Sequence, residues 1–271
     1  MSELVTLERI GKVVLITLNR PEARNAINLE TAQALAQAMD EFDADPSIAV
    51  GVLTGANNTF CAGMDLKAFA KRPYVGDRGF AGICERPPAK PLIAAVEGYC
   101  LAGGFEIALS CDLIVAADSA NFGLPEVKRG IVPGSGGMVR LPSRIPYHMA
   151  MEMVLTGGMY PAARMAELGL VSRLAEPGKT TEQALALAEQ IAANGPLAVQ
   201  TAKSIISQSR DWRQSDLFDL QRPRIAGIFT SADAKEGATA FAETREPVWQ
   251  GKYFPLVHPV FDIDATMTTI K

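Results

Sequence analysis

Short apolar runs rich in β-branched residues alternate with helical apolar spacing over the first half of the chain. Residues 13–18 (VVLITL) end at Asn19-Arg20-Pro21 and predict a strand. Residues 29–42 carry apolar side chains on one helical face behind Asn28, whose side chain can cap the helix. Further strands are expected at residues 48–54, 92–96 and 113–117. Strands separated by helical stretches favour an α/β fold with substantial parallel pairing.

From residue 147 onward the pattern becomes almost entirely helical. Helices are expected at residues 147–156, 161–168, 181–193, 197–208, 214–229 and 232–245, and only residues 169–174 interrupt them, as a short strand. Two segments fit neither pattern. Residues 70–91 mix basic side chains with prolines, which is typical of a mobile functional loop or short-helix lid. Residues 252–271 follow the last helix without periodicity.

The composition is that of a globular protein, because 48% of the 271 residues are hydrophobic and 21% are charged. The net charge of −4 lacks the positive footprint that nucleic acid requires. The acidic start, Met1-Ser2-Glu3, is unlike a signal peptide, and no apolar run approaches the roughly 18 residues of a membrane span. We therefore expect a cytoplasmic protein that binds neither nucleic acid nor membrane.

The cysteines are scattered without a C-x-x-C pair, which argues against a zinc site or a disulfide framework. Buried free thiols are expected instead at Cys61, Cys84, Cys100 and Cys111. Only two histidines are present, too few for a multi-histidine metal site. Acid–base chemistry would therefore fall to carboxylates.

Two glycine motifs fail as nucleotide or nucleophile signatures. Gly178-Lys179-Thr180 resembles the end of a P-loop, but residue 173 is Arg, so a turn before a helix is expected. Gly134-Ser135-Gly136-Gly137 fits neither the dinucleotide fingerprint nor the nucleophile elbow. It still predicts a glycine-rich turn that opens a helix and exposes backbone N–H groups.

Three further glycine-containing segments lie where predicted strands give way to loops or helices: residues 60–67, 97–106 and 122–126. A helix that begins at Gly103-Gly104 would present an unpaired backbone N–H, one half of an oxyanion hole, and a loop N–H near Met64 could supply the other.

Glu106 and Glu126 are the candidate acid–base groups. Glu106 lies in an apolar helical stretch beside Phe105, and Glu126 follows Leu124 and Pro125. Burial would raise the pKa of each carboxyl group, which suits proton transfer. A salt-bridged or capping role is the alternative for either residue alone, but the pair beside glycine-rich turns favours catalysis.

These segments resemble the crotonase superfamily, also called the enoyl-CoA hydratase/isomerase family. The similarity extends over about residues 5–250 and is most specific over residues 91–137, with Asn19-Arg20-Pro21 and Arg24-Asn25-Ala26 as a further signature. The resemblance implies an α/β fold, a spiral of ββα turns. It implies a core with the CoA and active sites over residues 1–195 and a helical trimerisation region over 196–251; residues 252–271 receive no role.

The resemblance also implies a mechanism. The backbone N–H groups of Met64 and Gly103 would hold the thioester carbonyl and its enolate. Glu106 would activate a water, Glu126 would protonate the α-carbon, and the Gly134 N–H would help to place the water. Because both carboxylates are present, reversible hydration of a 2-trans-enoyl-CoA to a 3-hydroxyacyl-CoA, as in fatty acid metabolism, is favoured.

The residues that match CoA-contacting positions in the family are Arg24, Ala62, Asp65, Leu66, Lys67 and, from a neighbouring subunit, Phe241. A lysine that often follows three residues after the last of these is Thr244 here, and Arg245 could substitute for it. Candidates for the acyl pocket are Phe69, Phe80, Ile83, Tyr99 and Phe105. No metal and no cofactor other than the CoA of the substrate are expected, and the family assembles as trimers or dimers of trimers.

Several alternatives remain open at the level of the sequence. A Δ3-Δ2-enoyl-CoA isomerase would need Glu126 alone. The middle block is also similar to members that act on crotonobetainyl-CoA. A noncatalytic acyl-CoA-binding or RNA-binding member is the alternative of a different class; the acidic charge balance disfavours RNA, and the carboxylate pair disfavours a pure binder.

Overall fold

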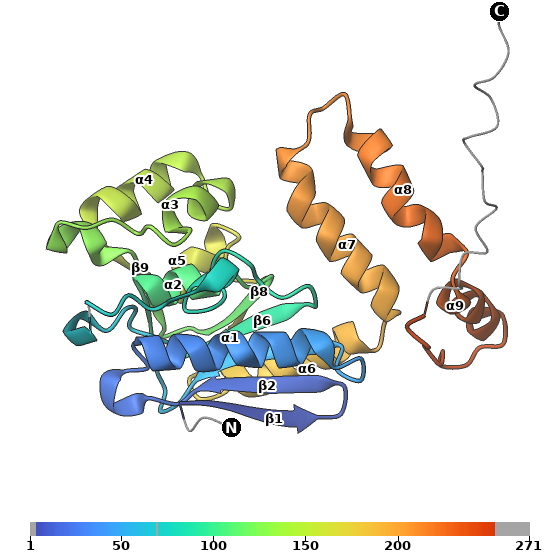
Figure 1. Ribbon diagram of the computed structural model, residues 1–271, viewed down its shortest axis with the longest axis horizontal. Helices are drawn as coiled ribbons and strands as arrows, with labels where there is room; N and C mark the ends of the chain where they lie inside the picture. The colour runs from blue at the N-terminus through green and yellow to red at the C-terminus, as the bar shows by residue number, and fades with distance from the viewer. Residues whose placement is uncertain (1–3, 69, 253–271) are drawn as a thin grey trace, which may run out of the picture. The chain divides into compact units, whose positions relative to one another are not determined.

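The computed structural model describes residues 4–68 and 70–252 and divides into two compact units, the first ending at Asn194 and the second beginning at Gly195. The first unit is built on a six-stranded sheet with the order β1-β2-β3-β6-β8-β11 (Figure 1). Its strands are β1 (Val5–Ile10), β2 (Val13–Leu18), β3 (Val50–Gly55), β6 (Leu92–Val96), β8 (Leu113–Ala117) and β11 (Arg173–Ala175). All neighbouring pairs are parallel except β1 with β2.

The parallel strands agree closely with the expected ones, but β1 was not anticipated. Only Val5 of this edge strand is buried, and Thr6, Glu8 and Arg9 are polar and exposed. A strand with one buried residue gives no apolar run, so the sequence pattern could not predict it. A strand was predicted at residues 169–174. The observed strand, β11, is shorter and begins later, at Arg173–Ala175.

Helices cover both faces of the sheet. Helix α1 (Leu29–Ala44) lies on one face, and the Thr31 N–H donates to the Oδ1 of its cap Asn28 over 2.9 Å. Helix α6 (Thr180–Ala192) packs on the other face through Ala184, Ala188 and Ala192, whose small side chains recur four residues apart. Because alternate strand residues point to opposite faces, each helix meets its own apolar layer of β-strand side chains.

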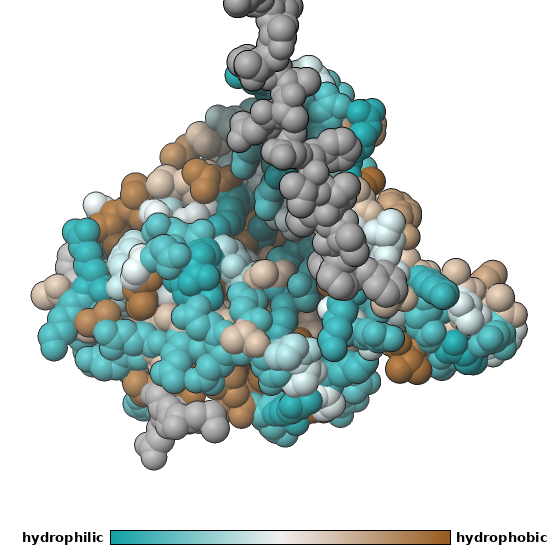
Figure 2. All heavy atoms as spheres, turned by 45° about the vertical axis from the view of Figure 1, so that its right-hand side comes forward, coloured by the Kyte–Doolittle hydropathy of each residue, from teal (hydrophilic) through white to brown (hydrophobic). Residues whose placement is uncertain are grey.

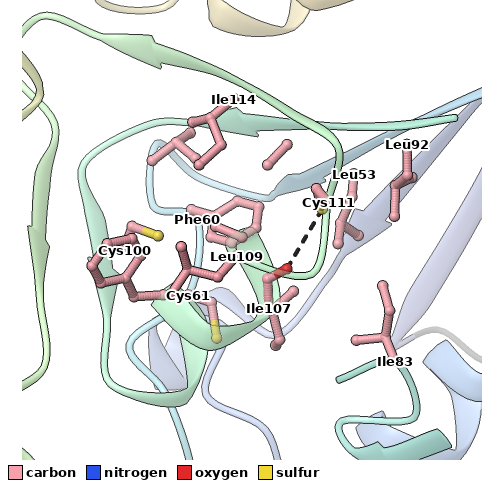
Figure 3. Close-up of a cluster of buried hydrophobic side chains, with 14 of the residues drawn as sticks. Leu53, Phe60, Cys61, Ile83, Leu92, Cys100, Ile107, Leu109, Cys111 and Ile114 are labelled. Carbon is pink, nitrogen blue, oxygen red and sulfur yellow. Dashed lines mark hydrogen bonds between the residues drawn. The ribbon is translucent and has the colours of Figure 1, made fainter. Parts of the chain in front are cut away.

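The four cysteines are buried and free, as expected. Three of them, Cys61, Cys100 and Cys111, lie among apolar side chains in the core between the sheet and the short helix α2 (Gly103–Ala108), where Cys111 Sγ donates to the Ile107 carbonyl over 3.5 Å (Figure 3). Burial raises the pKa of the Cys61 thiol to about 12, so this thiol is uncharged and acts as a core residue.

Two small sheets stand apart from the main one. The first has the order β10-β9-β7, made of β10 (Met159–Pro161), β9 (Asn121–Gly123) and β7 (Tyr99–Leu101). The second is the hairpin of β4 (Tyr74–Val75) and β5 (Gly79–Phe80). The remaining elements of this unit that bear on the site are the 3-10 helix η4 (Pro125–Arg129), α3 (Gly137–Arg140), α4 (Tyr147–Thr156) and α5 (Ala162–Glu167).

Residues 70–91, the expected mobile lid, are instead bonded to helix α1 through several of their residues between 78 and 90. The buried Arg78 guanidinium binds the Asp40 carboxylate at 2.6 Å and donates to the Arg86 carbonyl at 2.8 Å. The N–H groups of Ala89 and Lys90 donate to Asp43. Some of the basic residues of this predicted loop therefore anchor it to the acidic end of α1.

Gly178-Lys179-Thr180 is a turn before helix α6, as expected, and its N–H groups have an acceptor from a distant segment. Glu97, at the end of β6, accepts from the Gly178 N–H at 2.8 Å and from the Thr180 hydroxyl at 2.8 Å. A buried carboxylate therefore caps α6 across the sheet, a structural role.

The second unit is helical, with α7 (Pro196–Gln208), α8 (Leu217–Phe229) and α9 (Ala232–Ala242). Ser231 caps α9, and the chain after it returns so that the Gln250 N–H donates to Asp233 at 2.7 Å. Helix α9 ends earlier than the predicted residue 245 because Thr244 adopts a left-handed φ of 53°. The prediction for residues 252–271 falls almost wholly outside the described part of the chain. No helix in the described ranges is long and apolar enough to cross a membrane, and the exposed side chains in Figure 2 are mostly hydrophilic.

Candidate active site

Strand pairing brings the three glycine-containing segments to one place. β7 and β9 are parallel, with Leu101 opposite Gly123, so the chain leaves both strands at the same edge. β7 leads into α2 and Glu106, and β9 leads into η4 and Glu126. On the other side of β7, Cys61 forms a parallel bridge with Cys100.

The N–H groups of Met64 and Gly103, the predicted oxyanion donors, lie close together. A Cβ built on Gly103 would be 3.5 Å from the Met64 nitrogen, and a Cβ built on Gly63 would be 3.1 Å from the Gly103 nitrogen. Within residues 4–68 and 70–252, neither N–H donates to any acceptor. Two neighbouring unpaired donors are the arrangement that stabilises an oxyanion.

Local backbone geometry aims these two donors. Ala102, just before α2, has φ 51° and ψ −129°, a conformation that costs an L-residue free energy and turns the chain abruptly into the helix. Gly63 has φ 102°, and a side chain there would lie 2.8 Å from the Ala102 Cβ. Glycine at residue 63 is therefore required for the close approach of the two loops.

The Glu106 carboxylate is buried and held by the glycine-rich turn. Its Oε1 accepts the Ser135 N–H at 2.6 Å and the Gly137 N–H at 2.9 Å, and the residue is 3% exposed. Desolvation raises the pKa of Glu106, while the two backbone donors and the positive charge of Arg140 oppose that rise. The donors stabilise the ionised form, which is the form that accepts a proton.

Glu126 is also buried, but one of its carboxyl oxygens lacks any such donor in the described part of the chain. It is 7% exposed, and its Oε2 is a buried side-chain oxygen without a hydrogen-bond partner among the described residues. Burial, with a smaller contribution from the negative charge of Glu106, raises the pKa of Glu126 to about 7. Burial thus favours the neutral, proton-donating form of Glu126, whereas the backbone donors of the turn oppose the same effect of burial at Glu106, a difference that suits an acid and a base in one site.

Sequence reasoning missed four residues that support this centre. It predicted free N–H groups in the 134–137 turn but not that Ser135 and Gly137 direct them at Glu106. Arg140 donates to the Ser110 hydroxyl and the Cys84 carbonyl, and Tyr74 contacts Ser135. The signal for these two bonds in the sequence was the glycine-rich turn itself. The carboxylate that accepts them, Glu106, is distant in sequence. Gly134 is exposed beside these residues, and its water-placing role stays a prediction.

The predicted CoA residues cluster on two adjoining loops. The Ala62 N–H donates to the Arg24 carbonyl at 3.0 Å, and the Asp65 N–H donates to the Ile27 carbonyl at 2.9 Å. The Asp65 carboxylate pairs with Arg20 at 2.8 Å, and this bond lowers the pKa of Asp65, so its charge is already neutralised. Leu66 and Lys67 follow in the short 3-10 helix η2 (Leu66–Ala68), and both are exposed.

Arg24 is exposed beside the ring of Tyr99, with 6.0 Å between the guanidinium carbon and the ring centroid. Arg24 and Lys67 therefore leave two cations in solvent near the paired Arg20–Asp65, available to phosphate groups. Of the other acyl-pocket candidates, Ile83 and Phe105 are fully buried in the core. Phe69 lies outside the described residues.

Phe241 lies on α9 in the second unit and is 89% exposed, so its predicted contact with CoA stays a prediction. The suggestion that Arg245 could replace a family lysine is weakened. Its guanidinium binds Glu236 at 2.6 Å and Glu243 at 2.7 Å, which occupies its charge. Over the ranges that the structure describes, no group of His, Cys, Asp and Glu side chains could hold a metal ion.

Comparison with known proteins gives consistent matches. The sequence pattern of the enoyl-CoA hydratase/isomerase family matches residues 8–252. Over 255 residues the chain is 42% identical to an enoyl-CoA hydratase of Mycobacterium tuberculosis, which covers 91% of this chain and 96% of the relative. It is also 42% identical over 261 residues to a carnitinyl-CoA dehydratase of Salmonella arizonae, and this alignment covers 93% of this chain and all of the relative.

Solved structures agree. An enoyl-CoA hydratase of Mycobacterium tuberculosis superposes with a TM-score of 0.91 at 55% identity, covering 93% of this chain and all of the other. A carnitinyl-CoA hydratase of Mycobacterium avium superposes with a TM-score of 0.74 at 40% identity, covering 93% of this chain and all of the other.

Proposed function

Because the chain belongs to the enoyl-CoA hydratase/isomerase family, we propose that it is an enoyl-CoA hydratase acting on 2-trans-enoyl-CoA thioesters. The observation that carries the proposal is the contrast between two buried carboxyl groups beside a pair of unpaired N–H donors. Glu106 is stabilised as the carboxylate by two backbone donors, and Glu126 has a pKa raised to about 7 by burial. Hydration needs one base and one acid at adjacent carbons.

The reaction follows from these positions. Glu106 removes a proton from water while the water oxygen forms a bond to the β-carbon. The electron pair of the double bond moves to the thioester oxygen, and the enolate is stabilised by the N–H groups of Met64 and Gly103. Glu126 then gives its proton to the α-carbon, which restores the thioester. The Gly134 N–H is proposed to orient the water, and no cofactor takes part other than the CoA of the substrate.

The CoA moiety is proposed to lie along the two adjoining loops. Its phosphates would contact the exposed cations Arg24 and Lys67, and its adenine would pack on the backbone from Ala62 to Leu66, with Asp65 held in place by Arg20. The exposed ring of Phe241 would contact CoA bound to a neighbouring subunit.

A Δ3-Δ2-enoyl-CoA isomerase is the second candidate, because Glu126 alone could move a proton between carbons. It is less well supported, since it leaves unused a Glu106 that is buried and held by two N–H donors. Similarity to a carnitinyl-CoA dehydratase keeps a trimethylammonium acyl group among possible substrates. A noncatalytic acyl-CoA binder would have no need of a carboxyl group with a pKa near 7.

Incubation with crotonyl-CoA tests the proposal directly. We expect the absorbance of the conjugated thioester to decline to an equilibrium, and the same equilibrium to be reached from 3-hydroxybutyryl-CoA. A 3-enoyl-CoA offered in parallel separates the candidates, because an isomerase converts it without forming the hydroxyacyl product. Tight binding of both thioesters without conversion would instead identify a binder.

The pH dependence of kcat/KM is expected to be the same for hydration and dehydration. Both directions need the carboxyl pair to hold one proton in total, because the reaction itself neither releases nor takes up a proton. Glu126 has its pKa raised to about 7, so above that pH the pair loses its proton and kcat/KM falls about tenfold per pH unit. Initial rates in both directions measure this. A profile flat through pH 7 would contradict the assignment of Glu126 as the acid.

We also propose that the helices of the second unit associate with other copies of the chain, as a trimer or dimer of trimers. Helices α7 and α8 contain no buried residue, and Ile206, Phe218 and Phe229 are each at least 67% exposed. Apolar surface of this kind is typical of an interface. Sedimentation equilibrium should give three or six times the chain mass of 28.9 kDa. A mass of one chain would contradict the proposal.

A further inference from the structure

Arg140 joins the glycine-rich turn to the helix that carries the base. It is the last residue of α3, and its guanidinium donates through Nη1 to the Ser110 hydroxyl at 3.2 Å and through Nη2 to the Cys84 carbonyl at 2.5 Å. The Ser110 hydroxyl in turn donates to the backbone carbonyl of Glu106 at 2.8 Å. Ser110 and Cys84 are both buried. Two successive hydrogen bonds therefore connect the guanidinium to the backbone of the base.

The turn is shaped around the same guanidinium. The Arg140 N–H donates to the Gly136 carbonyl at 2.8 Å. A Cβ built on Gly136 would lie 2.3 Å from Arg140 Nη1, and Gly136 has φ 118°, in the left-handed region that favours glycine. The residues on either side of it, Ser135 and Gly137, are those whose N–H groups donate to Glu106 at 2.6 Å and 2.9 Å. Gly136 therefore leaves room for the guanidinium against the part of the turn that holds the base.

We propose that Arg140 is a positioning residue for the base: its guanidinium fixes α2 against the glycine-rich turn and thereby holds the two backbone N–H donors on the Glu106 carboxylate. A planar guanidinium carries several N–H donors in a fixed geometry, so one side chain can bond the Ser110 hydroxyl and the Cys84 carbonyl at once. Arg140 is assigned no contact with the reacting atoms. The inference rests on the proposed function, in which Glu106 is the base.

The connection bridges segments that are distant in sequence. Ser110 and Cys84 precede Arg140 by 30 and 56 residues, and α2 itself contains only six residues. A hydrogen bond weakens steeply as its donor and acceptor move out of line, so a small displacement of the turn against α2 would loosen both N–H donors. Weaker donors stabilise the carboxylate less, which raises the pKa of Glu106.

The charged or titratable groups that face Glu106 come from three elements. Glu126 on η4 repels its charge, and the Cys84 thiol, whose pKa burial raises to about 12, stays neutral in the segment after β5. Arg140 on α3 attracts the charge, so a variant that removes the guanidinium loses an attraction as well as two hydrogen bonds. Ser110→Ala separates the two effects, because it removes the bond to the Glu106 backbone and leaves all of these charges in place.

The test compares the pH profiles of kcat/KM for Ser110→Ala, Arg140→Lys and Arg140→Met with crotonyl-CoA. Looser donors raise the pKa of Glu106, so the acid limb moves to higher pH while the alkaline limb, set by Glu126, stays in place. On the acid side we expect a fall of about tenfold for Arg140→Met, equivalent to about one pKa unit, and about threefold for Ser110→Ala. Arg140→Lys should lie between the unaltered protein and Arg140→Met, because one ammonium group keeps the charge but cannot bond both partners.

Arg173→Met is the matched control, because that guanidinium donates at 3.1 Å to Gln190 on α6, the helix on the other face of the sheet. Its profile should superpose on that of the unaltered protein. An unshifted acid limb in Ser110→Ala, or a fully restored profile in Arg140→Lys, would mean that charge alone acts on Glu106 and would overturn the positioning role. A loss that is equal at every pH would also overturn it, since Arg140 would then only stabilise the fold.

A readout independent of turnover separates this inference from the proposed function. The infrared carboxyl band that disappears in Glu106→Gln can be titrated in each variant without substrate. Its midpoint should move to higher pH in Arg140→Met and, less far, in Ser110→Ala; if Arg140→Met does not fold, Ser110→Ala and Arg140→Lys carry the comparison. Shifted midpoints in a protein that does not hydrate crotonyl-CoA would support the positioning role and contradict the hydratase. Unshifted midpoints in an active hydratase would do the reverse.

Discussion

Replacing Glu126 by Gln is expected to lower kcat for hydration of crotonyl-CoA by about 10³-fold, within the range that a general acid contributes. The amide has almost the same shape but no proton to give to the α-carbon. KM should change little, because in the proposed mechanism the Met64 and Gly103 donors hold the carbonyl oxygen and other residues hold CoA. The buried Glu126 Oε2 has no hydrogen-bond partner within the described ranges, so the substitution breaks no bond of the fold there.

Glu106→Gln should cause a similar loss for a different reason. Its amide oxygen can still accept the N–H groups of Ser135 and Gly137, so the turn stays in place while the base is lost. Glu97→Gln is the control for exchanging a buried carboxylate, because Glu97 accepts from α6 and lies outside the centre. Initial rates with crotonyl-CoA and melting temperatures are measured for all three. Hydration within tenfold of the unaltered rate in either site variant would contradict the paired mechanism.

The sequence predicted the elements that are buried on both faces. The bounds of β2, β6 and β8 are those expected, because runs such as Leu92–Val96 are continuous and apolar. The half-exposed helix α4 also has its expected bounds. The structural neighbours confirm the family resemblance and the crotonase-like α/β fold. The edge strand β1 and the short strands of the small sheets could not be predicted. β1 has a single buried residue, and the short strands have only two or three residues each, too few to leave a pattern. They form because another segment pairs with them.

The site was predictable where chemistry is local and not where it depends on distant pairing. Glu106 was expected to be buried because its own neighbours are apolar, and Gly103 was expected to begin a helix. The acceptor of the Ser135 N–H lies 29 residues away, and the Arg20–Asp65 ion pair joins two separate loops. Nothing local to Arg78 distinguishes it from a solvated lysine or arginine, yet it is among the largest fully buried side chains. The tertiary fold, and not the local sequence, brings such partners together.

Gly103→Ala is expected to lower kcat about 10²- to 10³-fold, the usual effect of losing one oxyanion donor. The added methyl group would lie 3.5 Å from the Met64 nitrogen, beside the space that the enolate oxygen must occupy. It would also lie 2.5 Å from the buried ring of Phe80, so the variant should lose stability as well. Rates with crotonyl-CoA and urea unfolding measure the two effects separately.

The double variant Gly103→Ala with Phe80→Leu distinguishes the oxyanion hole from simple overpacking. Leucine lacks the ring atoms that the methyl group would meet, so the free energy of unfolding should recover in part. The methyl group would still lie beside the Met64 N–H, so kcat should stay low. Recovery of kcat together with stability would mean that displacement of Phe80, and not obstruction of the hole, caused the loss. Unchanged kcat in Gly103→Ala itself would show that the enolate is not held at these two N–H groups.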